Sequence, residues 1–174
     1  MDRKIIIAIN GGARTGKDSF YLANSDNSLR MAFADKLKQL AFETFGTSPK
    51  KELLDEKLAR KQRDVWIYFG QAGRLATGGK VWVDMVIDQI IHDEPKKPIV
   101  ITDVGFINEI VRLKQRLPEY KIIPLRVERP GQKFIEDGRE NISKDLPTVH
   151  LCNAGTLDEY YLKSRVLFEE LTRI

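Results

Sequence analysis

Short apolar runs alternate along this chain with longer segments of helical periodicity. The apolar runs are four to seven residues long, as buried strands are, and they occupy residues 4–10, 29–34, 98–103, 121–127 and 149–152. Between them, apolar residues recur every three or four positions in a brief segment that ends near residue 24 and over residues 36–45, 106–117 and 156–171. Strands that alternate with helices predict a five-stranded parallel sheet with helices on both faces, an α/β fold.

A long and mostly polar stretch over residues 48–93 is predicted to be helical and to break at Gly78 and Gly79. Its expected apolar anchors are Leu53, Leu54, Leu58, Trp66, Phe69 and Leu75. Two other helices are expected to bury one face each, with Leu37, Leu40, Ala41 and Phe45 in the first and Leu157, Tyr160, Tyr161, Leu167 and Leu171 in the last. Residues 130–147 are polar with little periodicity, which predicts a mobile loop.

Composition limits the function. The 174 residues suit one domain, and 42% hydrophobic with 31% charged residues is ordinary for a soluble globular protein. A net charge of +4 favours anionic ligands, but no block of like charges or binding motif points to a nucleic acid polymer. The first apolar run is too short for a signal peptide or a membrane span. Cys152 is the only cysteine, so we expect it to be a small buried residue in a cytoplasmic protein without internal disulfides.

The most informative motif follows the first apolar run. Residues 11–19 read GGARTGKDS between a predicted strand and a predicted helix, which is the context that a phosphate-binding P-loop requires. Glycines let the loop curl around an anion, and its N–H groups and the helix dipole favour negative charge. The motif therefore predicts a polyphosphate site made by Gly11, Gly12, Ala13, Arg14, Thr15, Gly16, Lys17, Asp18 and Ser19.

Asp18 stands where the P-loop usually has Ser or Thr. The usual hydroxyl ligates Mg²⁺, and Asp18 could hold the metal directly or through water. Ser19 is no simple replacement, because one helical step rotates it by about 100°.

Further chemistry is expected at the carboxyl ends of the strands, where open parallel sheets bind their ligands. Those ends carry Asp35, Asp103 and Asn153. Asp103 suits a metal-orienting carboxylate, but it also suits a helix or turn cap, and Asp35 has the same two interpretations. Phosphoryl transfer also needs cations around the moving group, and the candidates besides Lys17 are Arg14, Arg74, Arg126, Arg129 and Arg139. Arg129 and Arg139 belong to the polar loop, which could close as a lid.

Five blocks occur in one order along nearly the whole chain. They are GARTGKDS at 12–19, FADKLK at 33–38, QAGR at 71–74 followed by Trp82, ITDVGFINE at 101–109 and NAGTL at 153–157. This ordered set resembles the bacteriophage deoxynucleoside monophosphate kinases, a branch of the P-loop nucleoside monophosphate kinase-like fold. In that family the lysine of the P-loop is typically followed by Asp and then Ser or Thr, so Asp18 is a familiar variant.

The resemblance implies one three-layer P-loop kinase domain over residues 1–174, with a helical region for the nucleoside monophosphate at 35–93 and a lid-like loop at 129–150. It implies ATP and Mg²⁺ as cofactors and a deoxynucleoside monophosphate as substrate, and a homodimer is also compatible with it. No membrane partner is expected, because the first apolar run is too short to span a membrane. Asn153, Gly155 and Thr156 would then lie near the adenine. Together with the P-loop motif it assigns catalysis to Lys17, Arg14, Asp35 and Arg129, the metal to Asp18 and Asp103, and substrate binding to Asp35, Lys38, Trp66, Arg74, Trp82 and Asp103.

The chain departs from the family at two places. Gly105 stands where the family has Arg, so another cation must take the place of that side chain if it grips the substrate phosphate. The family's His-x-Ser-Glu element is also not evident between Arg129 and Asn153. Two alternatives therefore stay open. One is another small-molecule kinase of this fold, similar to dephospho-CoA kinase or phosphomevalonate kinase, and the other is a nucleotide-binding module without catalysis.

Overall fold

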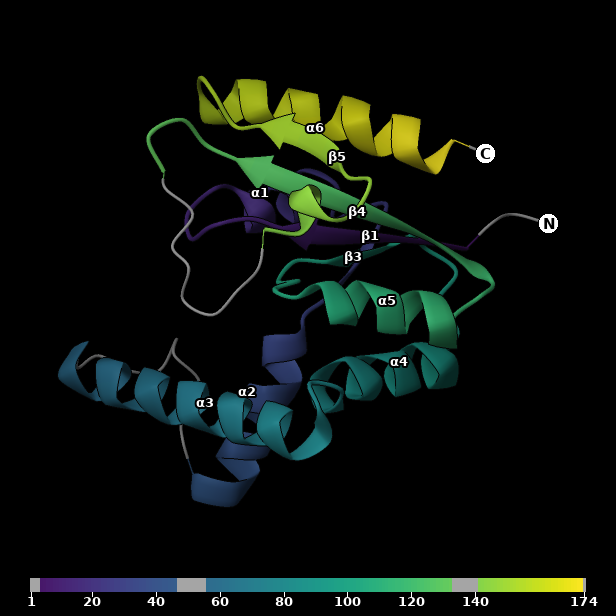
Figure 1. Cartoon of the computed structure of the whole chain (residues 1–174). Coiled ribbons are helices and arrows are strands. Elements are labelled where there is room, and N and C mark those ends of the chain that lie inside the picture. Colours follow the sequence, from purple (N-terminus) through teal and green to yellow (C-terminus); the bar gives the residue numbers. More distant parts are fainter. Residues whose placement is uncertain (1–3, 47–55, 133–140, 174) are drawn as a thin grey trace.

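The structure, a computed structural model, describes residues 4–46, 56–132 and 141–173, and of residues 56–62 it describes the backbone alone. Five strands form one parallel sheet in the order β2-β3-β1-β4-β5 (Figure 1). The strands are β1 (Lys4–Asn10), β2 (Leu29–Met31), β3 (Ile99–Ile101), β4 (Tyr120–Glu128) and β5 (Val149–Cys152). The predicted five-stranded parallel sheet is confirmed.

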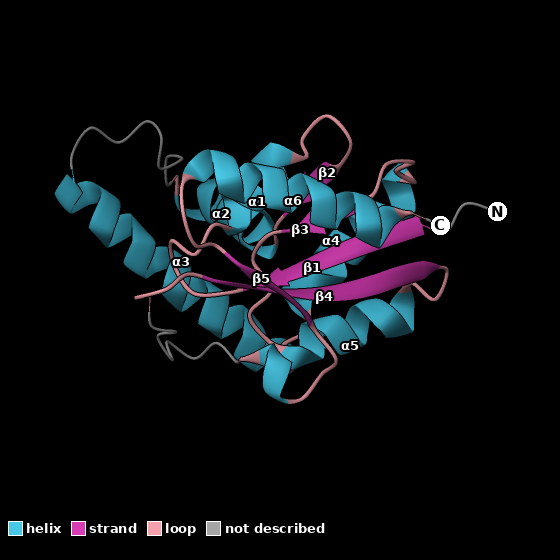
Figure 2. Cartoon of the chain, turned by 90° about the horizontal axis from the view of Figure 1, so that it is seen from above, coloured by secondary structure: helices cyan, strands magenta, loops and turns pink. Residues whose placement is uncertain are grey.

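Helices cover both faces of the sheet and complete three layers (Figure 1). They are α1 (Lys17–Ala23), α2 (Phe33–Phe45), α3 (Glu56–Thr77), α4 (Val81–Asp93), α5 (Ile107–Arg116) and α6 (Leu157–Thr172). The first half of α3 extends beyond the sheet, as Figure 2 shows from above. Among the described residues, no helix is long and apolar enough to cross a membrane.

The alternation of side chains along β1 separates two hydrophobic cores. Ile5, Ile7 and Ile9 face one side, where they join Phe20 of α1 and Tyr160 of α6. Ile6 and Ala8 face the other side and join buried residues of α2, α3, α4 and α5. Because both faces of β1 are buried, its sequence is a continuous apolar run, as expected for a central parallel strand.

The structure corrects the boundary between β2 and α2. The apolar run over residues 29–34 predicted a strand up to Ala34, but β2 ends at Met31 and α2 already begins at Phe33. Asp35 therefore lies in the first turn of α2 and not at the end of a strand. The carboxylate of Asp103 accepts hydrogen bonds from the backbone N–H groups of Phe33 and Ala34, and so it stabilises this early start.

Several burial predictions were wrong. Cys152 is exposed, because it is the last residue of an edge strand. Leu75 is 88% exposed, and Phe45 and Leu157 are also exposed, although Phe45 retains an edge contact with the Phe69 ring. Leu53, Leu54 and Arg139, and the side chain of Leu58, lie outside the described residues.

The polar segment predicted as one loop is only partly irregular. Its described portion contains a short 3-10 helix, Ile142–Lys144, in which Ile142 is fully buried in the core. The lid function of residues 129–150 stays a prediction.

Candidate functional site

The P-loop lies between β1 and α1 and has the backbone that its glycines allow. Gly16 has a φ of 111°, in the left-handed region, directly before α1 begins at Lys17. The ammonium group of Lys17 donates hydrogen bonds to the carbonyl oxygens of Gly11 and Gly12, at 2.9 and 2.6 Å. Its cationic end is thus folded over the loop, where an anion seated on the N–H groups would meet it.

Two side chains from the carboxyl-terminal part of the chain support this loop. The side-chain amide of Asn153 donates to the carbonyl oxygen of Thr15 at 2.8 Å, and the Tyr160 hydroxyl donates to that of Gly16 at 3.0 Å. Burial raises the pKa of Tyr160 to about 12, so this hydroxyl keeps its proton. A Cβ at Gly16 would lie 2.6 Å from the Asn153 amide nitrogen, which gives this glycine a steric reason in addition to its φ.

A cavity of about 280 Å³ opens above the P-loop. The structure brings many of the predicted nucleotide residues together there, and the lining consists of Arg14, Gly16, Lys17, Asp18, Ser19, Arg129, Asn153, Gly155 and Leu157. Thr156 does not line the cavity but caps α6, where its hydroxyl accepts from the backbone N–H of Glu159 at 3.3 Å. We call this space the P-loop cavity.

Arg126, another candidate cation, is a buried residue of β4. Only 4% of it is exposed, and its guanidinium donates to the side-chain oxygen of Asn10 and, at 3.2 Å, to the carboxylate of Glu128. Asn10 in turn donates to the carbonyl oxygen of Val104 at 2.8 Å. This network joins the ends of β1 and β4 to the segment after β3, so Arg126 serves the framework of the site.

Asp103 follows β3, which ends at Ile101, and its two carboxylate oxygens hold the start of α2. They accept from the N–H groups of Phe33 at 2.9 Å and of Ala34 at 2.8 Å. Burial raises the pKa of this carboxyl group, even though the two hydrogen bonds act to lower it. Asp103 therefore acts as a helix cap, as the sequence allowed. The helix that it caps is α2, which begins seventy residues earlier in the chain.

An arginine that the sequence did not single out joins the P-loop to α2. The guanidinium of Arg30, on β2, lies 2.6 Å from the carboxylate of Asp35 and 3.9 Å from that of Asp18. Burial alone would lower the pKa of Arg30, but the hydrogen bond and charge of Asp35, with Asp18 and Asp103, raise it. No local sequence pattern distinguishes Arg30, because both of its partners are brought to it by the fold.

Asp18 and Asp103 are the two predicted metal residues. Among the described residues, no three His, Cys, Asp or Glu side chains gather as a metal cluster. A Mg²⁺ ion bound with ATP needs only one or two carboxylates, because phosphates and waters complete its shell. Asp18 is 78% exposed on the first turn of α1, and each oxygen of Asp103 has a second lone pair, so each of these carboxylates has an oxygen that suits Mg²⁺ as a ligand.

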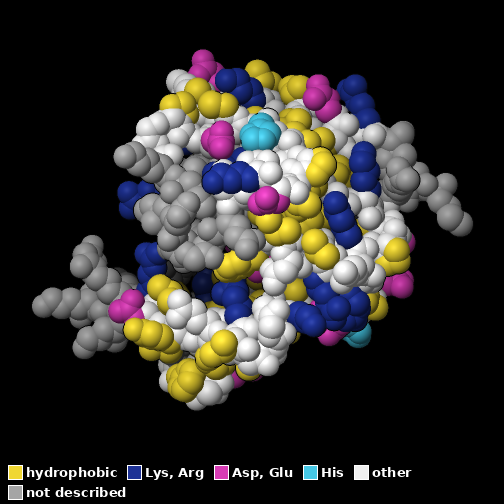
Figure 3. Space-filling model, in the orientation of Figure 1, with side chains coloured by type: hydrophobic (Ala, Val, Ile, Leu, Met, Phe, Trp, Pro, Cys, Tyr) yellow, Lys and Arg dark blue, Asp and Glu magenta, His cyan; other side chains and the backbone are white. Residues whose placement is uncertain are grey.

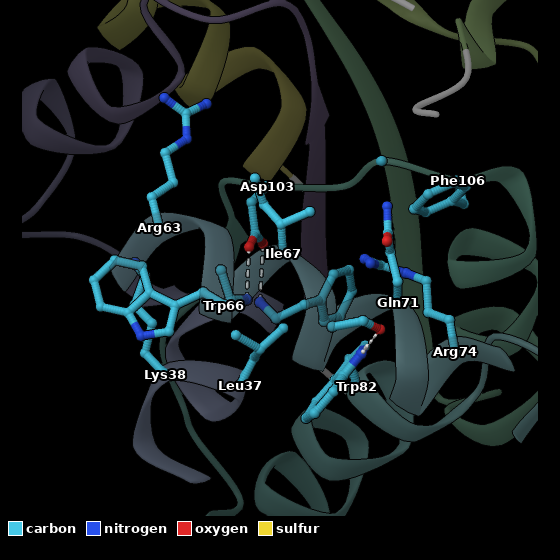
Figure 4. A pocket seen from close by; sticks show the side chains of 14 residues that line it. Leu37, Lys38, Arg63, Trp66, Ile67, Gln71, Arg74, Trp82, Asp103 and Phe106 are labelled. Carbon is cyan, nitrogen blue, oxygen red and sulfur yellow. Dashed lines mark hydrogen bonds between the residues drawn. The ribbon is translucent and has the colours of Figure 1, made fainter. Parts of the chain in front are cut away.

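A second cavity of about 470 Å³ lies between α2, α3 and the segment after β3 (Figure 4). Five of the six predicted substrate residues line it, whereas Asp35 lies outside it. Its lining consists of Phe33, Ala34, Leu37, Lys38, Arg63, Trp66, Ile67, Gly70, Gln71, Arg74, Trp82, Asp103, Gly105 and Phe106. We call it the acceptor cavity. Apolar and aromatic side chains dominate it, and cations stand at separate places on its wall.

Cationic side chains also lie on the surface around the acceptor cavity. Figure 3 shows a hollow between α3 and the rest of the molecule, with Lys and Arg side chains at its rim. Lys38 lies 5.7 Å from the ring centre of Trp66, and Arg74 lies 4.7 Å from that of Phe106. The cavity thus combines flat apolar surfaces with positive groups beside them.

These features define the class of fold: a three-layer parallel sheet with a P-loop after β1, which is the fold of the P-loop kinases. No protein-family profile matches the sequence, and no curated protein matches it.

Several solved structures share this fold at low sequence identity. A gluconokinase from Sinorhizobium meliloti 1021 is 13% identical with a TM-score of 0.51, over 98% of this chain and 94% of that chain. A dephospho-CoA kinase from Campylobacter jejuni is 15% identical with a TM-score of 0.55, over 96% of each chain. A sugar kinase from Janibacter sp. HTCC2649 is 10% identical with a TM-score of 0.52, over 95% of each chain.

Proposed function

We propose that this protein transfers the terminal phosphoryl group of Mg·ATP to a deoxynucleoside monophosphate. An oxygen of the acceptor's phosphate forms a bond to the γ-phosphorus of ATP. The bond from that phosphorus to the bridging oxygen breaks, and ADP leaves. The P-loop cavity supports the ATP side of this reaction, and the similar solved structures include a gluconokinase and a dephospho-CoA kinase, which are small-molecule kinases.

The observation that carries the choice of acceptor is the lining of the acceptor cavity. Trp66, Trp82 and Phe106 supply flat aromatic surface, and Lys38, Arg63 and Arg74 supply positive charge. A nucleoside monophosphate has a flat base to stack and a phosphate to pair with a cation. A sugar acid such as gluconate would leave its hydroxyl groups against apolar walls, which costs free energy for each hydrogen bond that is lost.

The predicted catalytic residues would take the following roles in this reaction. Lys17, Arg14 and Arg129, which all line the P-loop cavity, would stabilise negative charge on the transferred group. Asp35 holds Arg30 at the junction between the P-loop and α2. Asp18 and Asp103 are the residues that would hold Mg²⁺, which would supply positive charge to the phosphates of ATP.

A coupled assay of ADP release tests the proposal directly. The protein is given Mg·ATP with each of the four common deoxynucleoside monophosphates, and with gluconate and dephospho-CoA as competing acceptors. We expect turnover with at least one deoxynucleotide and formation of its diphosphate, seen by anion-exchange chromatography. Turnover with gluconate or dephospho-CoA alone would assign another kinase activity, and ATP binding without any product would indicate a non-catalytic module.

A further inference from the structure

We propose that Glu109 is the positioning residue that holds Arg74 at the wall of the acceptor cavity, where Arg74 binds the phosphate of the acceptor. The inference rests on the proposed function, because it gives Arg74 the phosphate of the acceptor as its ligand.

Glu109 uses its two carboxylate oxygens for different tasks. One oxygen accepts hydrogen bonds from the backbone N–H groups of Gly105 at 2.8 Å and Phe106 at 3.1 Å. The other lies 3.7 Å from a guanidinium nitrogen of Arg74. Only 2% of the Glu109 side chain is exposed. Its first oxygen stabilises the start of α5, and its second oxygen faces Arg74.

Arg74 is held from two directions. It comes from the last turn of α3, and its guanidinium lies 4.7 Å from the ring centre of Phe106 as well as near Glu109. About a third of the Arg74 side chain is exposed, and it lines the acceptor cavity, where Figure 4 shows it close to Phe106. A guanidinium fixed by a ring and a carboxylate loses less freedom when it binds a phosphate than a free side chain does.

The hydrogen bonds and charges around Glu109 link its ionisation to the position of Arg74. Gly105 contributes only backbone to the cavity, and its N–H is already bonded to Glu109. The charged groups that face Glu109 are Arg74 from α3, which lowers its pKa, and Asp103 after β3, which raises it together with burial. Arg74 is therefore the cation that favours ionised Glu109, in addition to the backbone N–H groups of Gly105 and Phe106. Ionised Glu109 in turn attracts the guanidinium of Arg74.

Glu109→Gln separates positioning from structure. Glutamine keeps an oxygen for the two backbone N–H groups but has no charge for Arg74. We expect KM for the deoxynucleoside monophosphate to rise by about tenfold, the scale of one ion pair to a charged group, while KM for ATP stays unchanged. Asp84→Asn is the matched control, because it breaks the 2.8 Å ion pair from α4 to Arg112 on the same helix α5 without touching the cavity. It should lower the melting temperature and leave both KM values unchanged.

A second measurement is independent of turnover. The Glu109 carboxyl carbon is followed by ¹³C NMR through a pH titration in the wild type and in Arg74→Met. Loss of Arg74 should shift the midpoint to higher pH. An unchanged midpoint, or a KM for the acceptor in Glu109→Gln that moves no more than in Asp84→Asn, would overturn the proposal. If the wild type phosphorylates no deoxynucleotide, the acceptor role fails with the proposed function, and the titration alone still decides whether Arg74 and Glu109 form a pair.

Discussion

The indole N–H of Trp82 donates a 3.0 Å hydrogen bond to the backbone carbonyl oxygen of Gly70. This bond joins α4 to α3 underneath the acceptor cavity, where both residues are part of the lining. The close approach of α4 and α2 to α3 needs glycines in α3. A Cβ at Gly73 would lie 2.6 Å from an atom of the Trp82 ring, and a Cβ at Gly70 would lie 2.6 Å from Leu37 of α2.

Gly73→Ala should therefore destabilise the protein, although alanine is normally favoured over glycine within a helix by about 1 kcal/mol. The rigid indole ring cannot yield as the end of a leucine side chain can, so we expect a net loss of about 1–3 kcal/mol for Gly73→Ala and a smaller loss for Gly70→Ala. Urea denaturation measures both values. The double variant Gly73→Ala with Trp82→Phe is the control, because a smaller ring should recover part of the loss; a stabilised single variant would contradict the steric argument.

Lys17→Ala should lower kcat by about 100- to 1000-fold or more, because it removes a cation from the place where negative charge develops. The side chain is only partly buried and donates hydrogen bonds to carbonyl oxygens of the loop, so circular dichroism should show an intact fold. Lys163→Ala, which removes an exposed lysine of α6, controls for the loss of one positive charge. Turnover near that of the wild type would remove Lys17 from the mechanism.

The sequence predicted those parts of the fold whose causes are local. Each of the five strands contains a short apolar run, and the P-loop is a contiguous motif between a strand and a helix. The start of α2 was misplaced because its cap comes from Asp103, seventy residues later in the chain. Leu157 was expected to be buried from helical periodicity alone, which does not distinguish a contact with the sheet from the exposed edge of a helix.

In the candidate site, too, the sequence predicted residues of a local motif but missed residues whose roles depend on distant partners. The residues of the P-loop cavity could be named from one motif, whereas the acceptor residues Lys38, Trp66 and Trp82 came from the family resemblance and then proved to share one cavity. Arg30 and Glu109 were missed as site residues, since the partners that give them a role lie on other elements. Long-range electrostatic contacts of this kind depend on the assembled fold.

Asn153→Ala distinguishes a contact with the P-loop from a contact with adenine. The hydrogen bond from Asn153 to Thr15 supports the loop itself, so its loss should weaken binding of ATP and of inorganic tripolyphosphate by the same factor, about fivefold to tenfold. Calorimetric titration measures both. Tyr160→Phe removes the corresponding bond to Gly16 and should behave alike. If Asn153→Ala weakens the binding of ATP but not of tripolyphosphate, the adenine contact expected from the sequence is the correct interpretation.

Glu109 should make stability depend on pH near neutrality. Burial raises the pKa of this carboxyl group from 4.5 in the unfolded chain to about 7 in the folded protein. The folded state then binds more protons between these values, so the contribution of Glu109 to stability is fully present below about pH 4.5 and is lost as the pH rises to about 7. The full loss corresponds to about 3 kcal/mol.

Unfolding of Glu109→Gln at a series of pH values checks this sign. The stability of the variant relative to the wild type should increase from pH 4.5 to pH 8, because glutamine does not titrate. Glu159→Gln, which removes a glutamate from the same position in the first turn of α6, controls for the loss of such a carboxylate in general. A constant difference between wild type and Glu109→Gln would show that Glu109 does not titrate in this range.

Asp103 allows a test of two roles in one side chain. Asp103→Ala removes both acceptors from the start of α2 and should destabilise the protein by about 1–2 kcal/mol, whereas Asp103→Asn keeps one of them. If the carboxylate also holds Mg²⁺ or a water bound to it, both variants should need more metal for half-maximal activity, by about tenfold. A metal titration of Asp103→Asn that matches the wild type would leave Asp103 only its role as the cap of α2.

Because burial raises the pKa of Asp103, protons compete with the metal at a higher pH than at an exposed aspartate, so the wild type should need less Mg²⁺ as the pH rises.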